Sequence, residues 1–208
     1  MEEPVEMVIP RPYLGFIRNP FHYIGPHESF LLGLLIILLT GFTGSLTNTH
    51  FDGVLDVHTG AMGPLWIFLA PGFINWISLA LPLYVAGWII SGKRLRMGDL
   101  LGYQAFARAP MLVAVLFTLI PAFQRQALRP AEFTSDTFAF TVIVLVIVVM
   151  IALMVVWMYK GFTRTARRTG TKAIVAFVVA LIIGEIISKL AFYYLIAPAI
   201  TPVVLNLQ

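Results

Sequence analysis

The sequence contains no cysteine and few charged residues. None of its 208 residues is cysteine, and only 12% are Asp, Glu, Lys or Arg. The absence of cysteine excludes disulfides, thiolate metal sites and cysteine nucleophiles. The scarcity of charge accompanies 59% hydrophobic residues and a mean hydropathy of +0.89, which soluble domains do not reach. The chain is therefore predicted to be an integral membrane protein.

Long apolar segments predict an all-α fold, a polytopic bundle of five transmembrane helices. A helix of about 20 residues crosses the hydrocarbon core of a bilayer. The longest uninterrupted segment, 138–159, has 22 residues without Gly, Pro or charge, and we expect it to face lipid over much of its surface. Pro64–Ser91 contains Pro71 and Pro82, so it is either a re-entrant piece before a span from Phe73 or one long kinked helix. The predicted spans are Ser29–Thr47, a segment within Pro64–Ser91, Met111–Phe123, Phe138–Tyr159 and Ala173–Ala197.

The chain divides into an arm, a membrane domain and a tail. Residues 1–28 are rich in proline and lack the apolar core of a signal peptide, so we expect a cytosolic or interfacial arm without a long helix. Residues 29–198 form the five-helix domain, in which Gly33, Gly41 and Gly44 predict close contact of the first span with a neighbour. Residues 199–208 are a short uncharged tail.

Positive charges are concentrated in short loops between the apolar segments. Three cations occur in the four residues Lys93–Arg96, and a second basic loop runs from Lys160 to Lys172. By contrast, Asn48–Gly63 contains no Lys or Arg. Because cytoplasmic loops are enriched in Lys and Arg, we predict a cytosolic amino terminus and an external carboxyl terminus. The net charge of +4 is then a topology signal, and no nucleic-acid partner is predicted.

The same cations are candidates for contacts with anionic lipid headgroups or with a protein partner. We place Arg108, just before Pro110, at the headgroup boundary, where its long side chain can reach the membrane surface. The alternative is that these cations only fix the topology. The candidate residues are Lys93, Arg94, Arg96, Arg108, Arg164, Arg167 and Arg168.

The outer loop contains a possible metal site in the stretch HFDGVLDVH. On a single extended strand its two imidazoles and two carboxylates would lie on one face. Such side chains suit zinc or another divalent ion, and a metal with an open position could activate water for hydrolysis. No strict metal motif such as HExxH is present, so the alternative is a solvated loop without a cofactor. The four candidate ligands are His50, Asp52, Asp56 and His58.

One ionisable pair lies deep inside a predicted span. Glu185 and Lys189 are four residues apart, which puts them on one face of the last helix. Because charge inside a membrane is costly, we expect the two to pair and to face the bundle interior or an aqueous cavity. They either line a polar route for an ion, a proton or a lipid headgroup, or form a structural pair near Asn75 or Tyr193. For a buried pair, loss of Glu185 alone should destabilise the protein more than loss of both partners.

A family resemblance rests on the stretch WIISGKRLRMGDLLGYQAFARAPMLVAVLFTLIP. A span ends in a glycine-containing basic turn, a helix leads to Ala109-Pro110, a short span closes on Ile120-Pro121, and two more spans follow, joined by a basic turn. Over roughly residues 20–198 this pattern resembles the Yip domain, the membrane domain of Ypt/Rab-interacting proteins and their prokaryotic relatives. The resemblance implies five transmembrane helices with a cytosolic amino terminus. The short arm implies a prokaryotic-type member, hence a bacterial cytoplasmic membrane, and no catalytic residues are implied.

Three functions remain open on these features. The first is a non-enzymatic membrane protein of the Yip type, which organises membranes or binds lipid or a protein partner, including a second copy of itself. The second is a small transporter or lipid-translocating protein that uses Glu185 and Lys189. The third is a metal-dependent hydrolase at the His50–His58 loop. No Ser/His/Asp order, phosphate loop or cofactor motif occurs in the chain, so we expect the first.

Overall fold

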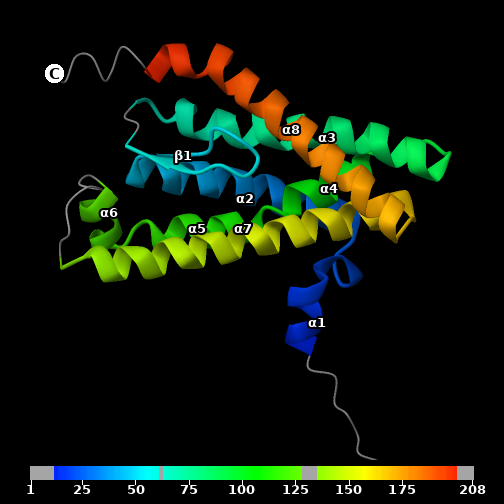
Figure 1. Ribbon diagram of the computed structural model, residues 1–208, viewed down its shortest axis with the longest axis horizontal. Helices are drawn as coiled ribbons and strands as arrows, with labels where there is room; N and C mark the ends of the chain where they lie inside the picture. The colour runs from blue at the N-terminus through cyan, green and yellow to red at the C-terminus, as the bar shows by residue number, and fades with distance from the viewer. Residues whose placement is uncertain (1–11, 61–62, 128–134, 201–208) are drawn as a thin grey trace, which may run out of the picture.

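Five membrane-spanning helical segments lie lengthwise beside one another (Figure 1). The computed structural model describes residues 12–60, 63–127 and 135–200. Its long helices are α2 (Pro26–Thr47), α3 (Trp66–Ser91), α7 (Thr137–Ala166) and α8 (Thr171–Leu195), and the remaining span is built from α4 (Met97–Phe106) and α5 (Ala109–Phe117). The predicted all-α membrane bundle is confirmed.

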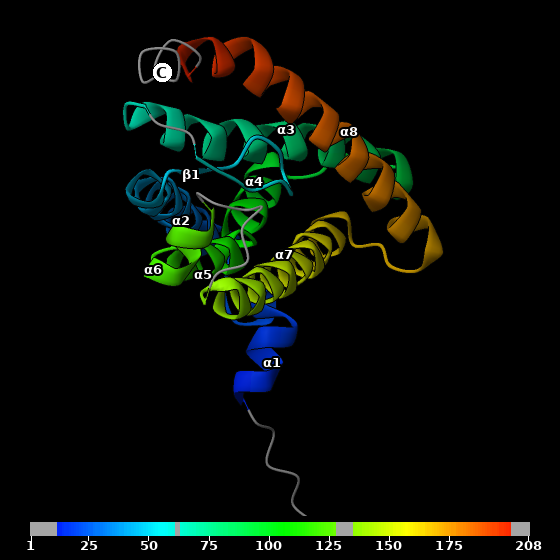
Figure 2. The ribbon, with the colours of Figure 1, turned by 60° about the vertical axis from the view of Figure 1, so that its left-hand side comes forward.

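The helices pack in three layers. α3 lies with α8 on one side, α5 lies with α7 on the other, and α2 and α4 lie between them (Figures 1 and 2). The main core runs through the middle of this arrangement and includes Phe21, Leu83, Met154 and Phe162. Two indole N–H groups are satisfied across helices, because Trp76 Nε1 donates to Leu101 O at 3.0 Å and Trp157 Nε1 donates to Ile17 O at 2.7 Å.

The proline-rich arm forms short helices beside the bundle. α1 (Pro12–Arg18) and the 3-10 turn η1 (Pro20–His22) precede α2, and α1 runs across the direction of the spans (Figure 1). The Phe16 ring meets Trp157 of α7 edge to face, 6.1 Å between centroids. The arm therefore contacts α7 through aromatic side chains, as an interfacial segment would. Its first eleven residues lie outside the described part of the chain, as do the last eight of the tail.

The segment with two interior prolines is a single helix. α3 is continuous from Trp66 to Ser91 and contains both Pro71 and Pro82. The re-entrant alternative is therefore wrong and the single-helix alternative is right. Neighbouring helices satisfy the backbone groups that a proline frees, so a transmembrane helix tolerates it.

The third span is not the segment that hydropathy indicated. It runs from Met97 to Phe117, and 67% of its apolar window is buried inside the bundle, so it is the central helical segment. The predicted Met111–Phe123 is wrong because Pro121–Ala127 is a separate short helix, α6, and because the polar-looking α4 is inside the bundle. Gln104 illustrates the reason, since its Nε2 donates to Met158 O of α7 at 2.9 Å inside the bundle.

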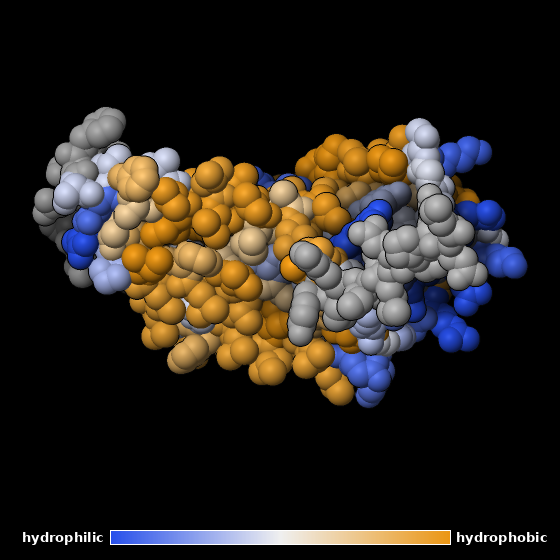
Figure 3. Space-filling view, turned by 90° about the horizontal axis from the view of Figure 1, so that it is seen from below, coloured by the Kyte–Doolittle hydropathy of each residue, from blue (hydrophilic) through white to orange (hydrophobic). Residues whose placement is uncertain are grey.

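The surface of the bundle is apolar across its middle. Only 17% of the apolar window of α7 is buried inside the protein, as expected for a helix that faces lipid. Figure 3 shows an apolar band with hydrophilic residues at both ends. We call the end with the α3–α4 and α7–α8 turns the basic end. The opposite end, with the loop between α2 and α3, is the hairpin end.

Candidate functional site

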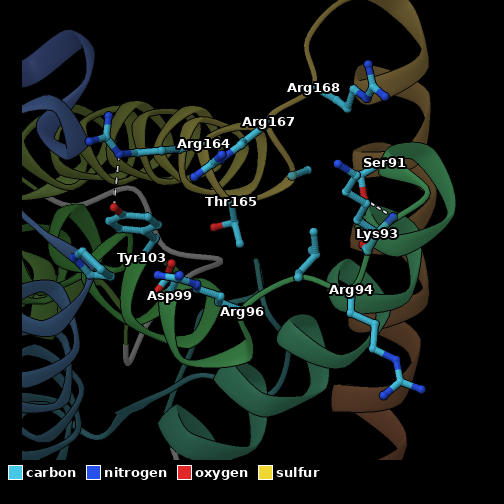
Figure 4. A pocket seen from close by; sticks show the side chains of 13 residues that line it. Ser91, Lys93, Arg94, Arg96, Asp99, Tyr103, Arg164, Thr165, Arg167 and Arg168 are labelled. Carbon is cyan, nitrogen blue, oxygen red and sulfur yellow. Dashed lines mark hydrogen bonds between the residues drawn. The ribbon is translucent and has the colours of Figure 1, made fainter.

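A cleft at the basic end gathers cations from two loops far apart in the sequence. It has a volume of about 730 Å³, and its walls come from the α3–α4 turn, the start of α4 and the end of α7 (Figure 4). Six of the seven predicted headgroup-binding cations are among its lining residues. The six are Lys93, Arg94, Arg96, Arg164, Arg167 and Arg168.

Two left-handed turns give the cleft its shape. Gly92 ends α3 with φ of 69°, which glycine adopts without a steric cost, and its N–H donates to Trp88 O at 2.9 Å. Ser91 Oγ then donates to Lys93 O at 2.9 Å and holds the turn. At the other wall, Arg167 ends α7 with φ of 51°, and Gly170 with φ of 84° leads into α8. Each turn thus places its cations directly beyond the end of a span.

The floor of the cleft is a buried tyrosine. Tyr103 is 5% exposed, its hydroxyl accepts a hydrogen bond from Arg164 Nε at 3.1 Å, and the guanidinium of Arg164 lies 5.9 Å from its ring centroid. Arg96 and Arg167 extend into the space between the helices, whereas Arg94 and Arg168 point outward (Figure 4). Asp99 also lines the cleft, in the first turn of α4, where the helix dipole favours a carboxylate. The cleft is strongly cationic and has a fixed aromatic floor.

Arg108, the seventh cation, is not at the headgroup boundary. It lies between α4 and α5 inside the third span, and it is 6% exposed. The prediction that it reaches the membrane surface is wrong. The apolar run after Pro110 seemed to begin the span, but the span begins eleven residues before Arg108, at Met97.

The tip of the outer loop packs into the bundle, and only part of the loop is exposed to solvent. Thr49–His50 (β1) and His58–Thr59 (β2) form a short antiparallel hairpin, with His50 opposite His58. The tip between the strands is packed among the helices, since Phe51 is 6% and Val54 is 1% exposed. Asn75 of α3 holds the tip, because its Nδ2 donates to Phe51 O at 3.0 Å and to Gly53 O at 2.7 Å. The single strand with one ligand face is therefore wrong. The solvated loop is right for only part of the segment, since His58 and Thr59 are exposed whereas Phe51 and Val54 are buried.

The four candidate metal ligands are divided between two sets of contacts. Asp52 Oδ1 lies 2.8 Å from His58 Nδ1, and the rings of His50 and His58 stack with centroids 5.8 Å apart. The Asp56 carboxylate instead forms an ion pair with Lys189 of α8. Among the described residues, no group of three His, Asp or Glu side chains is arranged to hold a metal ion. Burial lowers the pKa of His50 from its usual value, an effect that Asp52 opposes.

The charged pair of the last helix meets the hairpin. Glu185 and Lys189 form the predicted i, i+4 ion pair, with Oε1 and Nζ 3.7 Å apart. Glu185 Oε2 also accepts a hydrogen bond from the Leu55 N–H at 3.1 Å, and its carboxylate lies so close to Gly53 that a Cβ there would require the carboxylate to move. Lys189 is half exposed and makes a second ion pair with Asp56. The pair thus fastens the hairpin to α8, while Asn75 holds the hairpin to α3.

The sequence pointed to the cations of the cleft and to Tyr103 as a residue of the headgroup boundary. It gave no signal for Asp99 and Thr165, which line the cleft as well. Asn75 was expected beside Glu185, whereas it binds the backbone of the loop that Glu185 also binds.

Comparisons with models of protein families, with curated proteins and with solved structures found no match.

Proposed function

We propose that this chain is a non-catalytic membrane protein of the Yip type that binds the anionic headgroup of a phospholipid in its basic cleft. The observation that carries the proposal is the convergence of six cations from two separate loops on one cleft. Guanidinium groups bind phosphate through paired N–H donors. Clusters of basic residues next to a span attract anionic lipids, with about 1 kcal/mol per cation near the surface.

The position of the cleft favours a lipid over a soluble anion. Its walls lie where α3 and α7 end and where α4 begins, the level at which headgroups meet the ends of membrane-spanning helices. The apolar band of Figure 3 adjoins this hydrophilic end. A headgroup in the cleft would therefore have its acyl chains beside lipid-facing helices, and the Tyr103 ring would form the wall beneath it.

A transport route past Glu185 has less support. The hairpin tip fills the space over this carboxylate, as the close approach of Gly53 and the Leu55 hydrogen bond show. Glu185 and Lys189 therefore act as fastening residues in our proposal. Hydrolysis at the outer loop has less support as well, because Asp56 is drawn to Lys189 and away from the two histidines.

Lipid retention in native mass spectrometry tests the proposal. Detergent-solubilised protein is mixed with phosphatidylglycerol or phosphatidylcholine, and we expect preferential retention of phosphatidylglycerol that weakens at high salt. The double variant Arg96→Ala, Arg167→Ala should bind phosphatidylglycerol about 30-fold more weakly. The matched control is Arg18→Ala, which removes an exposed cation of α1 that does not line the cleft.

Two results would contradict lipid binding in the cleft. One is equal retention of the two lipids by the unchanged protein. The other is a preference for phosphatidylglycerol that survives in the double variant. Binding of acidic peptides to the unchanged protein, with equal retention of the two lipids, would reassign the cleft to a protein partner.

A further inference from the structure

The buried guanidinium of Arg108 has no partner in the described part of the chain. Arg108 lies eleven residues after Met97 and nine before Phe117, near the middle of the third span. Its Nε and Nη2 atoms are shielded from solvent and have no hydrogen-bond partner. A cation without a partner inside a bundle is unfavourable by several kcal/mol, so buried polar groups of this kind call for a bound ion or water.

The carboxylate whose charge acts on Arg108 is engaged elsewhere. The attraction comes from Glu185. Its Oε2 accepts the Leu55 N–H at 3.1 Å, and its Oε1 lies 3.7 Å from Lys189 Nζ. Glu185 therefore attracts the guanidinium from a distance without accepting a hydrogen bond from it. The N–H donors of Arg108 still need an acceptor.

Arg108 lines a small cavity together with residues of α2, α3, α5 and the hairpin, and the volume of this cavity is about 20 Å³. Roughly 10–15 Å³ is enough for one water-sized species, so the cavity accommodates a single small ion and is too small for a phosphate group. Phe51 and Phe68 provide apolar walls, and in such surroundings a full charge interacts more strongly than in water.

We propose that this cavity is a binding site for one small monovalent anion of halide size, chloride being the physiological case, held by the N–H groups of Arg108. One nearby group opposes an anion, because Asn75 also lines the cavity and its Oδ1 has no donor. Its Nδ2 is occupied by Phe51 O and Gly53 O, so the amide cannot turn its donors inward without losing both bonds. The whole charge of the guanidinium outweighs this amide dipole, and the anion sits on the Arg108 side of the cavity.

The site connects the anion to the hairpin. Asn75 and Phe51 both border the cavity, and both belong to the contact that holds the hairpin tip on α3. Neutralising Arg108 therefore stabilises the region in which the hairpin, α2 and α3 meet. The site is separate from the basic cleft, because Arg108 is not among the residues that line the cleft.

Thermal unfolding in detergent at constant ionic strength tests the anion site. We expect a higher Tm in sodium chloride than in sodium gluconate, whose anion is too large for the cavity, by about 3 °C at a tenfold excess of chloride over its Kd. Bromide should act as chloride does. Arg108→Gln should abolish the difference, and the triple variant Lys93→Ala, Arg94→Ala, Arg96→Ala should retain it, since it removes cations of the basic cleft and leaves Arg108 and its cavity unchanged.

A second measurement needs no change at Arg108. Chloride NMR of the unchanged protein should show line broadening that bromide reverses and gluconate does not, and the triple variant should show the same. Equal Tm values in chloride and gluconate, or no reversible broadening, would mean that the cavity holds water only and would overturn the proposal. Loss of the chloride effect in the triple variant would overturn it too, by assigning the ion to the basic end.

Discussion

Among single residues, Glu185 has more partners than its place in the sequence suggested. The i, i+4 spacing predicted one partner, Lys189, and a pair that is buried on both sides. In the structure the carboxylate also accepts the Leu55 N–H, while Lys189 is 49% exposed and has Asp56 as a second partner. Removing Glu185 therefore leaves Lys189 with a second partner and with solvent. Removing Lys189 leaves the more enclosed Glu185 without its ion pair.

This difference reverses the mutational expectation drawn from the sequence. Glu185→Ala removes an acceptor from a buried N–H and should lower the free energy of unfolding by about 1–3 kcal/mol. It does not leave Lys189 alone, so adding Lys189→Ala should give no rescue and a further loss of about 0–1 kcal/mol. Glu185→Gln, which keeps an acceptor for Leu55, is the matched control and should lose less. Unfolding in detergent measures all three variants, and a double variant more stable than Glu185→Ala would restore the isolated buried pair.

Among elements, the contact of α2 with α4 depends on glycine. A Cβ at Gly33 would lie 2.6 Å from the carbonyl carbon of Ala105, and a Cβ at Gly102 would meet Pro26 O. Small residues permit such close backbone approach in membranes. The sequence predicted that Gly33 would allow a close contact, but it did not identify α4 as the neighbour, because the predicted third span began only at Met111 and left Met97–Phe106 outside the bundle.

Gly33→Ala should therefore destabilise the bundle. The added methyl forces α2 and α4 apart, and overpacking of this kind costs about 1–3 kcal/mol. Gly98→Ala is the matched control, since Gly98 lies in the same α4 and a Cβ there meets nothing within 4 Å. Helix propensity makes that change neutral or slightly stabilising. Thermal melts of the two variants measure the effect, and equal Tm values would mean that α2 and α4 are not held in close contact in solution.

The same elements show which parts of the fold the sequence predicts and which it does not. Continuous apolar spans were located well, because hydropathy measures what faces lipid. Ser29–Thr47 differs from α2 by three residues at its start, whereas 138–159 ends seven residues before α7 does. The third span was misplaced because it faces protein: Gln104 and Tyr103 find their partners on α7. The depth of the hairpin was unpredictable for a related reason, since Asn75 and Glu185 satisfy its backbone from segments distant in sequence. The six cleft cations were predicted because charge next to a span is itself the signal.

Over the whole molecule, charge asymmetry makes a prediction about orientation. An odd number of spans puts the two chain termini on opposite sides of the membrane, and the structure gathers six cations at one end of the bundle. The hairpin end has no comparable excess of positive charge among the described residues. Asp52 and Asp56 lie there, and Asp136 neutralises the Arg125 guanidinium through two hydrogen bonds of 2.6 and 3.0 Å. The positive-inside rule therefore predicts that the basic end faces the cytosol.

The cysteine-free chain is a suitable background for testing this orientation, since a single introduced thiol is the only one that can react. Thr59→Cys places it at an exposed position of the hairpin, and Thr169→Cys places it in the exposed α7–α8 turn. A membrane-impermeant maleimide should label Thr59→Cys in intact cells and Thr169→Cys only after permeabilisation. The reverse pattern would mean an inverted protein, and the basic cleft would then lie on the external face. Replacing Lys93, Arg94 and Arg96 in each single-cysteine variant should give partial labelling of both cysteines in intact cells, because these cations contribute to the topology signal as well as to the cleft.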